Sequence, residues 1–350
     1  MYKLLVKGGD DMRQDAVMEQ VFDNVNCMLD RDTETSKRKL GIRTYRIVPT
    51  TPQTGVLQWV ENTLPFGTIL CDREMGTHPR YFPLDWSHMQ CREHLKDALN
   101  NEDKLQRFHN IYKHFHPAFR FFFLERYDNP TEWMACRLAY VRSVAANSIV
   151  GYILGIGDRH AHNILVDTLT AEVVHIDFGI VYEQGKGLGT PETVPFRLTR
   201  DMVDGMGVMG CEGTFRRSCE EVLRVMRDSM SQIMTILEVV MHDPLYKWSL
   251  SPLQARMKQH TAVTGIAGAE YKGRATVADK GTGRATGQQG SSFEKDAAER
   301  TLMRIKNKLQ GFEDPSGEAL SVEGQVDLLI NEAMSPANLC KIFPGWAPWL

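Results

Sequence analysis

One segment constrains the fold of this chain more than any other: a long apolar stretch that leads directly into a polar loop. Residues 133–154 are mostly apolar or small and predict a buried helix. Gly155 and Gly157 then interrupt the helical pattern. The apolar runs that follow, 164–166 and 173–176, are short and predict two strands with a turn between them. The segment therefore predicts a helix, a loop and a hairpin in that order.

The polar side chains of this loop and hairpin predict a phosphoryl-transfer site. Asp158 precedes Asn163 by five residues, and Asp177 follows Asn163 by fourteen and opens a D-F-G segment. Protein kinases place a catalytic Asp, an Asn and a D-F-G in this order. The hairpin would bring the oxygens of Asn163 and Asp177 together to hold Mg²⁺. Asp158 would accept the proton of the attacking hydroxyl. Either motif alone is weak, whereas both in this context are rare by chance.

The order of residues around Asp158 departs from the usual kinase pattern. The common H-R-D is reversed here to Asp158-Arg159-His160. We expect His160 to hydrogen-bond the γ-phosphate or to share the proton transfer. A metal site on His160 and His162 is a weaker interpretation, because no third ligand is spaced nearby.

Composition argues against several other classes of protein. The 350 residues contain 41 Lys and Arg against 44 Asp and Glu, so the net charge of −3 predicts no general attraction to nucleic acid or anionic membranes. The seven cysteines form no C-x-x-C pair, which argues against a zinc ribbon and for free thiols in a reducing compartment. The longest apolar stretch is too short to span a bilayer.

Several segments together resemble one kinase family. The reversed D-R-H with its flanking glycines, followed by H-I-D-F-G, resembles the phosphoinositide 3-kinase-related protein kinases. Residues 5–15 look like the nucleotide-binding strand and turn of that family. Residues 190–201 and 203–207 are most similar to its ataxia-telangiectasia-mutated (ATM) branch. Residues 320–349 look like the FATC segment that closes these kinases, although a small helical hairpin packed for stability would read the same way.

The resemblance implies an α+β, bilobal protein-kinase-like fold of the PI3/PI4-kinase type. Its expected parts are an incomplete β-rich N-lobe with the hinge, a mostly helical C-lobe with the catalytic and activation loops, a disordered linker, a helix leading to FATC, and the helical FATC domain: residues 1–65, 66–257, 258–292, 293–318 and 319–350. The linker follows from composition too, since it is rich in Gly, Ala, Thr and Gln. The Gly-rich phosphate loop should precede Lys7, so we expect a chain truncated at its N-terminus.

The resemblance also implies roles for individual residues. Lys7 would contact the ATP phosphates and act in catalysis with Asp158 and His160, while Asp15 would pair with Lys7 and Asp10 would lie near them. The adenine would be stacked and hydrogen-bonded at a hinge. The residues matching the hinge and the activation loop are Trp59 and Val60, then Phe178, Gly179, Glu192, Pro195, Phe196 and Arg197.

The function implied is that of a nuclear serine/threonine kinase in the DNA-damage response. Such a kinase transfers the ATP γ-phosphate to Ser or Thr followed by Gln on protein substrates, in double-strand-break signalling, cell-cycle checkpoints and telomere maintenance. Its cofactors would be ATP with Mg²⁺, or alternatively Mn²⁺. We expect contact with a DNA-break sensor complex through regions upstream of Met1, a homodimer as one possible assembly, and neither direct DNA nor membrane binding by this region.

Two other functions stay open from the sequence. A lipid kinase of the same fold would need a basic activation loop to hold an inositol phosphate headgroup, and residues 178–198 are near neutral. A catalytically inactive scaffold is the other alternative. The intact Asp158, Asn163 and Asp177 argue against it, although a truncated chain is not expected to be active alone.

Overall fold

The computed structural model describes residues 3–9, 11–241, 289–313 and 317–350. Asp10 and most of the predicted linker, 258–288, lie outside the described residues. The last residues of that predicted linker are helical, because α13 begins at Gln289. Within the described ranges, no helix is both long and apolar enough to cross a membrane.

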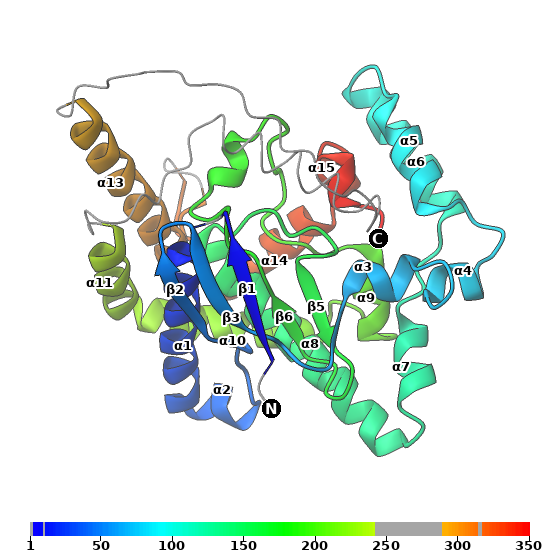
Figure 1. Ribbon diagram of the computed structural model, residues 1–350, viewed down its shortest axis with the longest axis horizontal. Helices are drawn as coiled ribbons and strands as arrows, with labels where there is room; N and C mark the ends of the chain where they lie inside the picture. Colours follow the sequence, from blue (N-terminus) through cyan, green and yellow to red (C-terminus); the bar gives the residue numbers. More distant parts are fainter. Residues whose placement is uncertain (1–2, 10, 242–288, 314–316) are drawn as a thin grey trace.

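The N-terminal part is a small antiparallel sheet packed beside one long helix. Its elements are β1 (Leu4–Gly8), α1 (Arg13–Arg31), α2 (Thr33–Lys37), β2 (Ile47–Thr51) and β3 (Thr54–Gln58). The strand order is β1-β3-β2, with Lys7 opposite Gly55. One face of α1 is apolar at helical spacing and is buried. The sheet and α1 lie side by side in Figure 1 and place Lys7 at the end of β1.

A second antiparallel sheet carries the predicted hairpin. Its strands are β4 (Thr63–Pro65), β5 (Ile164–Asp167) and β6 (Val173–His175), in the order β4-β5-β6. The hairpin agrees with the sequence pattern, but β4 is too short to give a periodic signal. It pairs with β5 from a distant part of the sequence. The expected lobe boundary at residue 65 therefore falls at the end of a strand that belongs to the second sheet.

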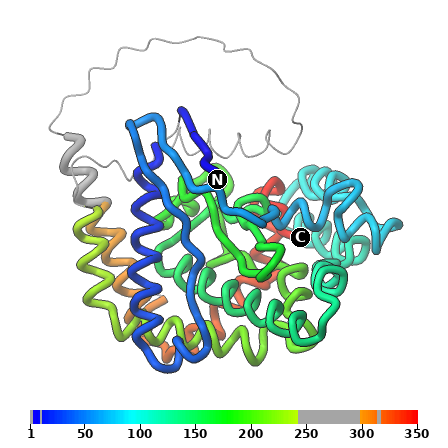
Figure 2. The backbone as a smooth tube through the Cα atoms, turned by 60° about the horizontal axis from the view of Figure 1, so that its bottom comes forward, coloured from blue at the N-terminus to red at the C-terminus, as the bar shows by residue number. Residues whose placement is uncertain are grey.

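Helices make up most of the remaining molecule (Figures 1 and 2). Along the chain, six helices lie between β4 and the polar loop: α3 (Phe66–Cys71), α4 (Thr77–Tyr81), α5 (His88–Lys96), α6 (Asn101–His114), α7 (Arg120–Arg126) and α8 (Pro130–Leu154). After the hairpin come η1 (Gln184–Gly187), α9 (Arg200–Met206), α10 (Thr214–Asp228), α11 (Met230–Met241), α13 (Gln289–Gln310), α14 (Val322–Met334), α15 (Pro336–Leu339) and η2 (Pro344–Trp346). One hydrophobic core runs from α1 through α8 and α10 to the C-terminal helices.

The central helix α8 positions the polar loop. Asn129 caps its start by accepting from the backbone of Thr131 at 2.9 Å, and Pro130 occupies the first turn. Its C-terminal half is buried on all sides and packs along α10. Gly155 ends it with a left-handed backbone, φ 63°, which a residue without Cβ adopts readily. The chain is thereby turned into the loop that contains Asp158.

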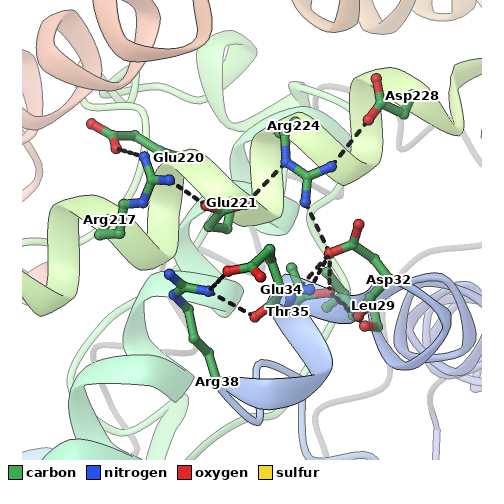
Figure 3. A network of polar contacts seen from close by, with 10 residues as sticks. All are labelled: Leu29, Asp32, Glu34, Thr35, Arg38, Arg217, Glu220, Glu221, Arg224 and Asp228. Atoms are coloured by element: carbon green, nitrogen blue, oxygen red, sulfur yellow. Dashed lines mark hydrogen bonds and ion pairs between the residues drawn. The ribbon is translucent and has the colours of Figure 1, made fainter.

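The far end of α1 is attached to α10 by a polar network (Figure 3). Asp32 accepts from the backbone N–H groups of Glu34 and Thr35 and so caps α2. The same carboxylate accepts from Nη2 of Arg224 on α10 at 2.8 Å. Arg224 also contacts Glu221 and Asp228 on its own helix. The network joins the N-terminal sheet region to the helical part of the molecule.

Candidate active site

Asp158 lies in a loop whose backbone is held on both sides of it. Its φ of 54° is left-handed, a conformation that costs a non-glycine residue about 1–2 kcal/mol. The amide of Asp158 donates to Oε1 of Glu192 at 2.7 Å, and its carbonyl accepts from Nδ2 of Asn163 at 3.0 Å. These contacts hold the strained backbone in one arrangement.

The D-F-G segment is anchored to α1 at the opposite side of the site. Phe178 is fully buried and meets the ring of Phe22 edge-on at 5.2 Å between centroids. Its amide donates to Oδ1 of Asp15 at 2.9 Å, and its carbonyl accepts from Nε2 of Gln14 at 2.5 Å. The first turn of α1 therefore fixes the position of Asp177.

Arg159 connects the catalytic loop to the D-F-G segment, a role that sequence reasoning missed. Its guanidinium is buried and donates to the carbonyls of Gly157 and Ile176, both at 2.8 Å, and to that of Asp177. Burial lowers the pKa of Arg159, although the nearby Asp158 and Asp177 oppose this effect. The one sequence feature that could have indicated this role is the position of Arg159 between the two predicted site residues Asp158 and His160.

The hairpin places Asn163 beside Ile176, the residue before Asp177. The carbonyl of Asn163 accepts from the amide of Ile176 at 3.0 Å, which places the residue before β5 beside the end of β6. Nδ2 of Asn163 donates to the loop, so the side-chain oxygen is the atom of Asn163 that could bind a metal ion. The Asp177 carboxylate is about half exposed and lies 3.9 Å from Nζ of Lys7. An amide oxygen and an exposed carboxylate fit Mg²⁺ with phosphate and water in its remaining positions.

The structure gives no third side chain for the metal site considered at His160 and His162, within the described residues. No group of three or more His, Cys, Asp or Glu side chains that could hold a metal occurs there. His160 Nδ1 accepts from the amide of His162 at 3.1 Å, which leaves Nε2–H as a donor. Burial, followed by the charge of Arg159, lowers the pKa of His160 to about 3. His160 is therefore suited to donating a hydrogen bond and poorly suited to accepting a proton near neutral pH.

The nucleotide-binding residues predicted from the N-terminal part lie around the same site. Lys7 and Asp15 both contact the D-F-G segment, and a direct pair between them stays a prediction. Trp59 follows β3, is 49% exposed, and donates its amide to the carbonyl of Lys3 at 3.1 Å. Val60 accepts from the hydroxyl of Thr63 at 2.8 Å. The two hinge candidates thus span the connection between the sheets, and their contact with adenine stays a prediction.

The activation-loop residues pack toward the C-terminal segment. Phe196 and Arg197 are buried. Arg197 donates to the carbonyls of Trp346, Ala347 and Leu350 at 2.7, 2.8 and 3.0 Å, and its guanidinium lies over the Trp346 ring. Burial lowers the pKa of Arg197 to about 9. The sequence placed Arg197 in this loop but gave no sign of its partners.

Comparison with known families agrees with this geometry. The model described as phosphatidylinositol 3- and 4-kinase matches residues 1–250. The chain belongs to the phosphatidylinositol 3- and 4-kinase family. A second model, the FATC domain, matches residues 319–350. The predicted bilobal kinase fold and FATC segment are confirmed.

Among curated members of this kinase family, the chain is similar to ATM-type kinases. It is 49% identical over 348 residues to the serine-protein kinase ATM of Sus scrofa and 49% identical over 354 residues to the serine/threonine-protein kinase ATM of Arabidopsis thaliana. These matches cover 99% and 100% of the chain but only 11% and 9% of the relatives. The chain thus spans about a tenth of the length of these relatives, and the predicted resemblance to the ATM branch is confirmed.

Solved structures of a related kinase have the same fold. The FAT and kinase domain of CtTel1 superposes with a TM-score of 0.83 at 40% identity, covering all of this chain and 22% of that one. The complete CtTel1 dimer with C2 symmetry gives the same TM-score and identity, with 12% of that chain covered. Kinases of this family use ATP with a divalent metal ion, which agrees with the arrangement of Lys7, Asn163 and Asp177.

Proposed function

We propose that the protein carrying this chain is a serine/threonine protein kinase that phosphorylates Ser or Thr followed by Gln. The observation that carries the proposal is the assembly of Asp158, Asn163 and Asp177 on one loop and hairpin, with Lys7 facing Asp177. The names of the ATM relatives support a serine/threonine acceptor. The near-neutral activation loop supports a neutral residue after the acceptor.

Each residue has a distinct task in the proposed reaction. Asp158 accepts the proton of the attacking hydroxyl and orients its oxygen. Asn163 and Asp177 hold Mg²⁺, with Mn²⁺ as the alternative, and the metal neutralises phosphate charge when it is bound. Lys7 contacts the phosphates, and His160 donates a hydrogen bond to the γ-phosphate. Trp59 and Val60 receive the adenine, with Asp15 and Asp10 beside Lys7.

The cellular setting is also a proposal. We place the kinase in the nucleus, in double-strand-break signalling, checkpoint control and telomere maintenance, with a DNA-break sensor complex as its activating partner. A homodimer is supported by the dimeric CtTel1 structure. Direct DNA contact by this region is not expected from its net charge of −3. We keep the domain limits at residues 65, 257, 292 and 318 as proposals.

The number and the contacts of the cationic side chains in the activation loop favour a protein over a lipid substrate. Residues 178–198 contain two cationic side chains, Lys186 and Arg197. Lys186 pairs with Glu183 at 3.0 Å, and Arg197 is buried under the C-terminal segment. Lys186 is exposed, but it is a single cation, so this loop does not offer the cluster of cations that would hold an inositol phosphate headgroup. An inactive scaffold is disfavoured because the base and metal positions are occupied by suitable side chains.

Two substitutions in the full-length protein test the site. Asp158→Ala should lower kcat by orders of magnitude while ATP affinity is largely kept, because the base touches the acceptor rather than the nucleotide. Asp177→Ala should lose Mg²⁺-dependent ATP binding as well. Initial rates with a Ser-Gln peptide and nucleotide titrations measure both effects, with the exposed Glu238→Ala as control. Turnover near wild type in either variant would refute the assignments, and phosphorylation of inositol lipid in place of peptide would refute the substrate class.

A further inference from the structure

Glu192 occupies the junction between the activation loop and the catalytic loop. Its Oε1 accepts from the amide of Asp158 at 2.7 Å, while its own amide donates to the carbonyl of Gly185 at 3.1 Å. One side chain therefore spans two loops that are separated in sequence by the hairpin. Asp158 lies in a loop, and this contact joins its partly buried amide to a residue 34 positions further along the sequence.

Two glycines leave the space that the Glu192 carboxyl fills. A Cβ on Gly157 would lie 2.5 Å from Oε2, closer than atoms can approach without displacement. A Cβ on Gly185 would meet the same oxygen. Gly157 belongs to the catalytic loop and Gly185 to η1 in the activation loop. The carboxyl therefore packs closely against both glycines.

Glu192 lies between two cavities, which show where its carboxyl could move. On one side is a cavity of about 480 Å³, lined among others by Glu183, Thr193 and Lys308. On the other is a small pocket lined among others by Asp158 and His160. Glu192 lines both. Movement of its carboxyl toward the larger cavity would withdraw the hydrogen bond from Asp158.

Resting on the proposed kinase function, we propose that Glu192 is a positioning residue: it fixes the backbone of Asp158 in its left-handed conformation and makes that conformation depend on the activation loop. It acts through the Asp158 backbone, so this role requires no contact with the nucleotide or the acceptor. The carbonyl of Asp158 is held by Asn163 and its amide by Glu192, so the base is aimed by contacts on both sides. Misplacement of a catalytic group by about 1 Å can cost a factor of about 100 in rate.

Substitution of Glu192 can show whether its hydrogen bond to the Asp158 amide acts by positioning or by charge. Burial is the main cause that raises the pKa of Glu192 to about 7. A carboxyl and a carboxamide of the same length both present an oxygen to the Asp158 amide. Glu192→Gln should therefore keep kcat within about fivefold of wild type, whereas Glu192→Ala should lower it about 10- to 100-fold. The KM for ATP should change less than about threefold in both variants.

A matched pair of glycine variants tests the same contact without altering Glu192. Gly185→Ala places a methyl group against the carboxyl, and Gly187→Ala, in the same short helix, meets no atom within 4 Å. Neither glycine has a left-handed backbone, so alanine is compatible with both. Gly185→Ala should reduce kcat in the same sense as Glu192→Ala, and Gly187→Ala should match wild type. The double variant Gly185→Ala/Glu192→Ala should be no slower than Glu192→Ala.

The experiment measures kcat and KM in the full-length protein and hydrogen exchange in residues 155–163. The acceptor used by the wild type is established first with Ser-Gln peptide and inositol lipid, so a wrong substrate class is recognised before any variant is compared. Faster exchange at the Asp158 amide in Glu192→Ala, with lower kcat and unchanged ATP affinity, supports the inference. It is overturned if Glu192→Ala or Gly185→Ala keeps the wild-type kcat, or if Glu192→Gln is as slow as Glu192→Ala. If Glu192→Ala does not fold, the two glycine variants decide.

Discussion

At the scale of single residues, the loops of this site are held by ionisable side chains whose partners are backbone groups. Asp15 accepts from the Phe178 amide, Glu192 accepts from the Asp158 amide, and Arg159 donates to loop carbonyls. These backbone groups lie outside helices and strands, where burial without a partner is costly. Charged side chains make the stronger class of hydrogen bond, which suits loops that must keep one shape.

Glu19 is a buried carboxyl of this kind whose ionisation opposes folding. It lies on α1, and its Oε2 accepts from the amide of Tyr45 at 3.0 Å. Burial is the main cause that raises the pKa of Glu19 from 4.5 to about 8, and the charges of Asp23 and Asp15 add to it. Because the pKa of Glu19 is higher in the folded state, its protonation stabilises the fold. This stabilisation is fully present below the unfolded-state pKa of 4.5 and is lost as the pH rises toward 8.

Glu19→Gln should therefore stabilise α1 more at pH 8 than at pH 5. The glutamine side chain keeps an oxygen that accepts from the Tyr45 backbone N–H but does not ionise. In the wild type, ionisation of Glu19 lowers the stability by at most about 1.4 kcal/mol per pH unit between the unfolded and folded pKa values. Hydrogen exchange of residues 13–31, compared with wild type at each pH, measures the difference. Equal protection of variant and wild type at pH 8 would show that the Glu19 carboxyl is not desolvated.

At the scale of elements, α1 is the link between the N-terminal sheet and the helical part. Its first turn holds the D-F-G segment through Gln14 and Asp15, and its last turn leads to Asp32, which contacts Arg224 on α10. The partners of the last contact are 192 residues apart in sequence. The helix α1 is therefore in contact with the D-F-G segment at its first turn and with α10 just beyond its last turn.

Asp32 has two tasks in this link, and substitution separates them. Asp32→Ala removes the cap of α2 and the ion pair, and should cost about 1–2 kcal/mol of local stability. Asp32→Asn keeps a capping oxygen and loses the charge, which for a partly exposed pair should cost less than about 1 kcal/mol. Arg224→Gln leaves the cap intact but also removes the pairs with Glu221 and Asp228, so it reports on the whole Arg224 network and not on the Asp32 pair alone.

The measurement is hydrogen exchange of residues 28–38 under native conditions, where local opening reports local stability. The expected order of exchange rates is Ala fastest, then Asn, then wild type. If Asp32→Asn exchanged as fast as Asp32→Ala, the ion pair rather than the cap would dominate, and the division of tasks described here would be wrong.

At the scale of the whole molecule, the C-terminal segment completes the activation loop. Arg197 inserts its guanidinium among three carbonyls of residues 346–350 and also donates to the carbonyl of Arg159 at 3.3 Å. The last residues of the chain are thereby connected to the catalytic loop through a single side chain. Trp349 is among the largest fully buried side chains, so this connection lies over apolar packing.

Arg197→Lys should loosen the C-terminal segment and lower activity. A lysine keeps the charge but cannot supply the planar set of donors that reaches several carbonyls at once. We expect at least a tenfold loss of phosphoryl transfer, by the order of magnitude that lost loop positioning costs, and faster hydrogen exchange in residues 336–350. Arg216→Lys is the matched control, because Arg216 contacts α14 through the exposed Asp327. Unchanged activity and exchange in Arg197→Lys would contradict the proposed coupling.

The sequence predicted those parts of the site that are close together along the chain. Asp158, Asn163 and Asp177 lie within one loop and hairpin, where local backbone geometry brings them together. The long helix α8 follows from its apolar composition, and the hairpin follows from two short apolar runs after the glycines. The resemblance added the family and the fold, which the matches to residues 1–250 and 319–350 confirm.

Tertiary structure alone decided the contacts that hold these residues in place. Strand β4 pairs with β5 from about a hundred residues away, Asp15 reaches Phe178, and Arg197 reaches the carbonyls of residues 346–350. The sequence does not distinguish a buried arginine from an exposed one, because the partners of an arginine depend on how distant elements pack. The sequence thus predicted Asp158, Asn163 and Asp177 as residues of the site, whereas the packing of α1, the activation loop and the C-terminal segment decided how the loops that carry them are held.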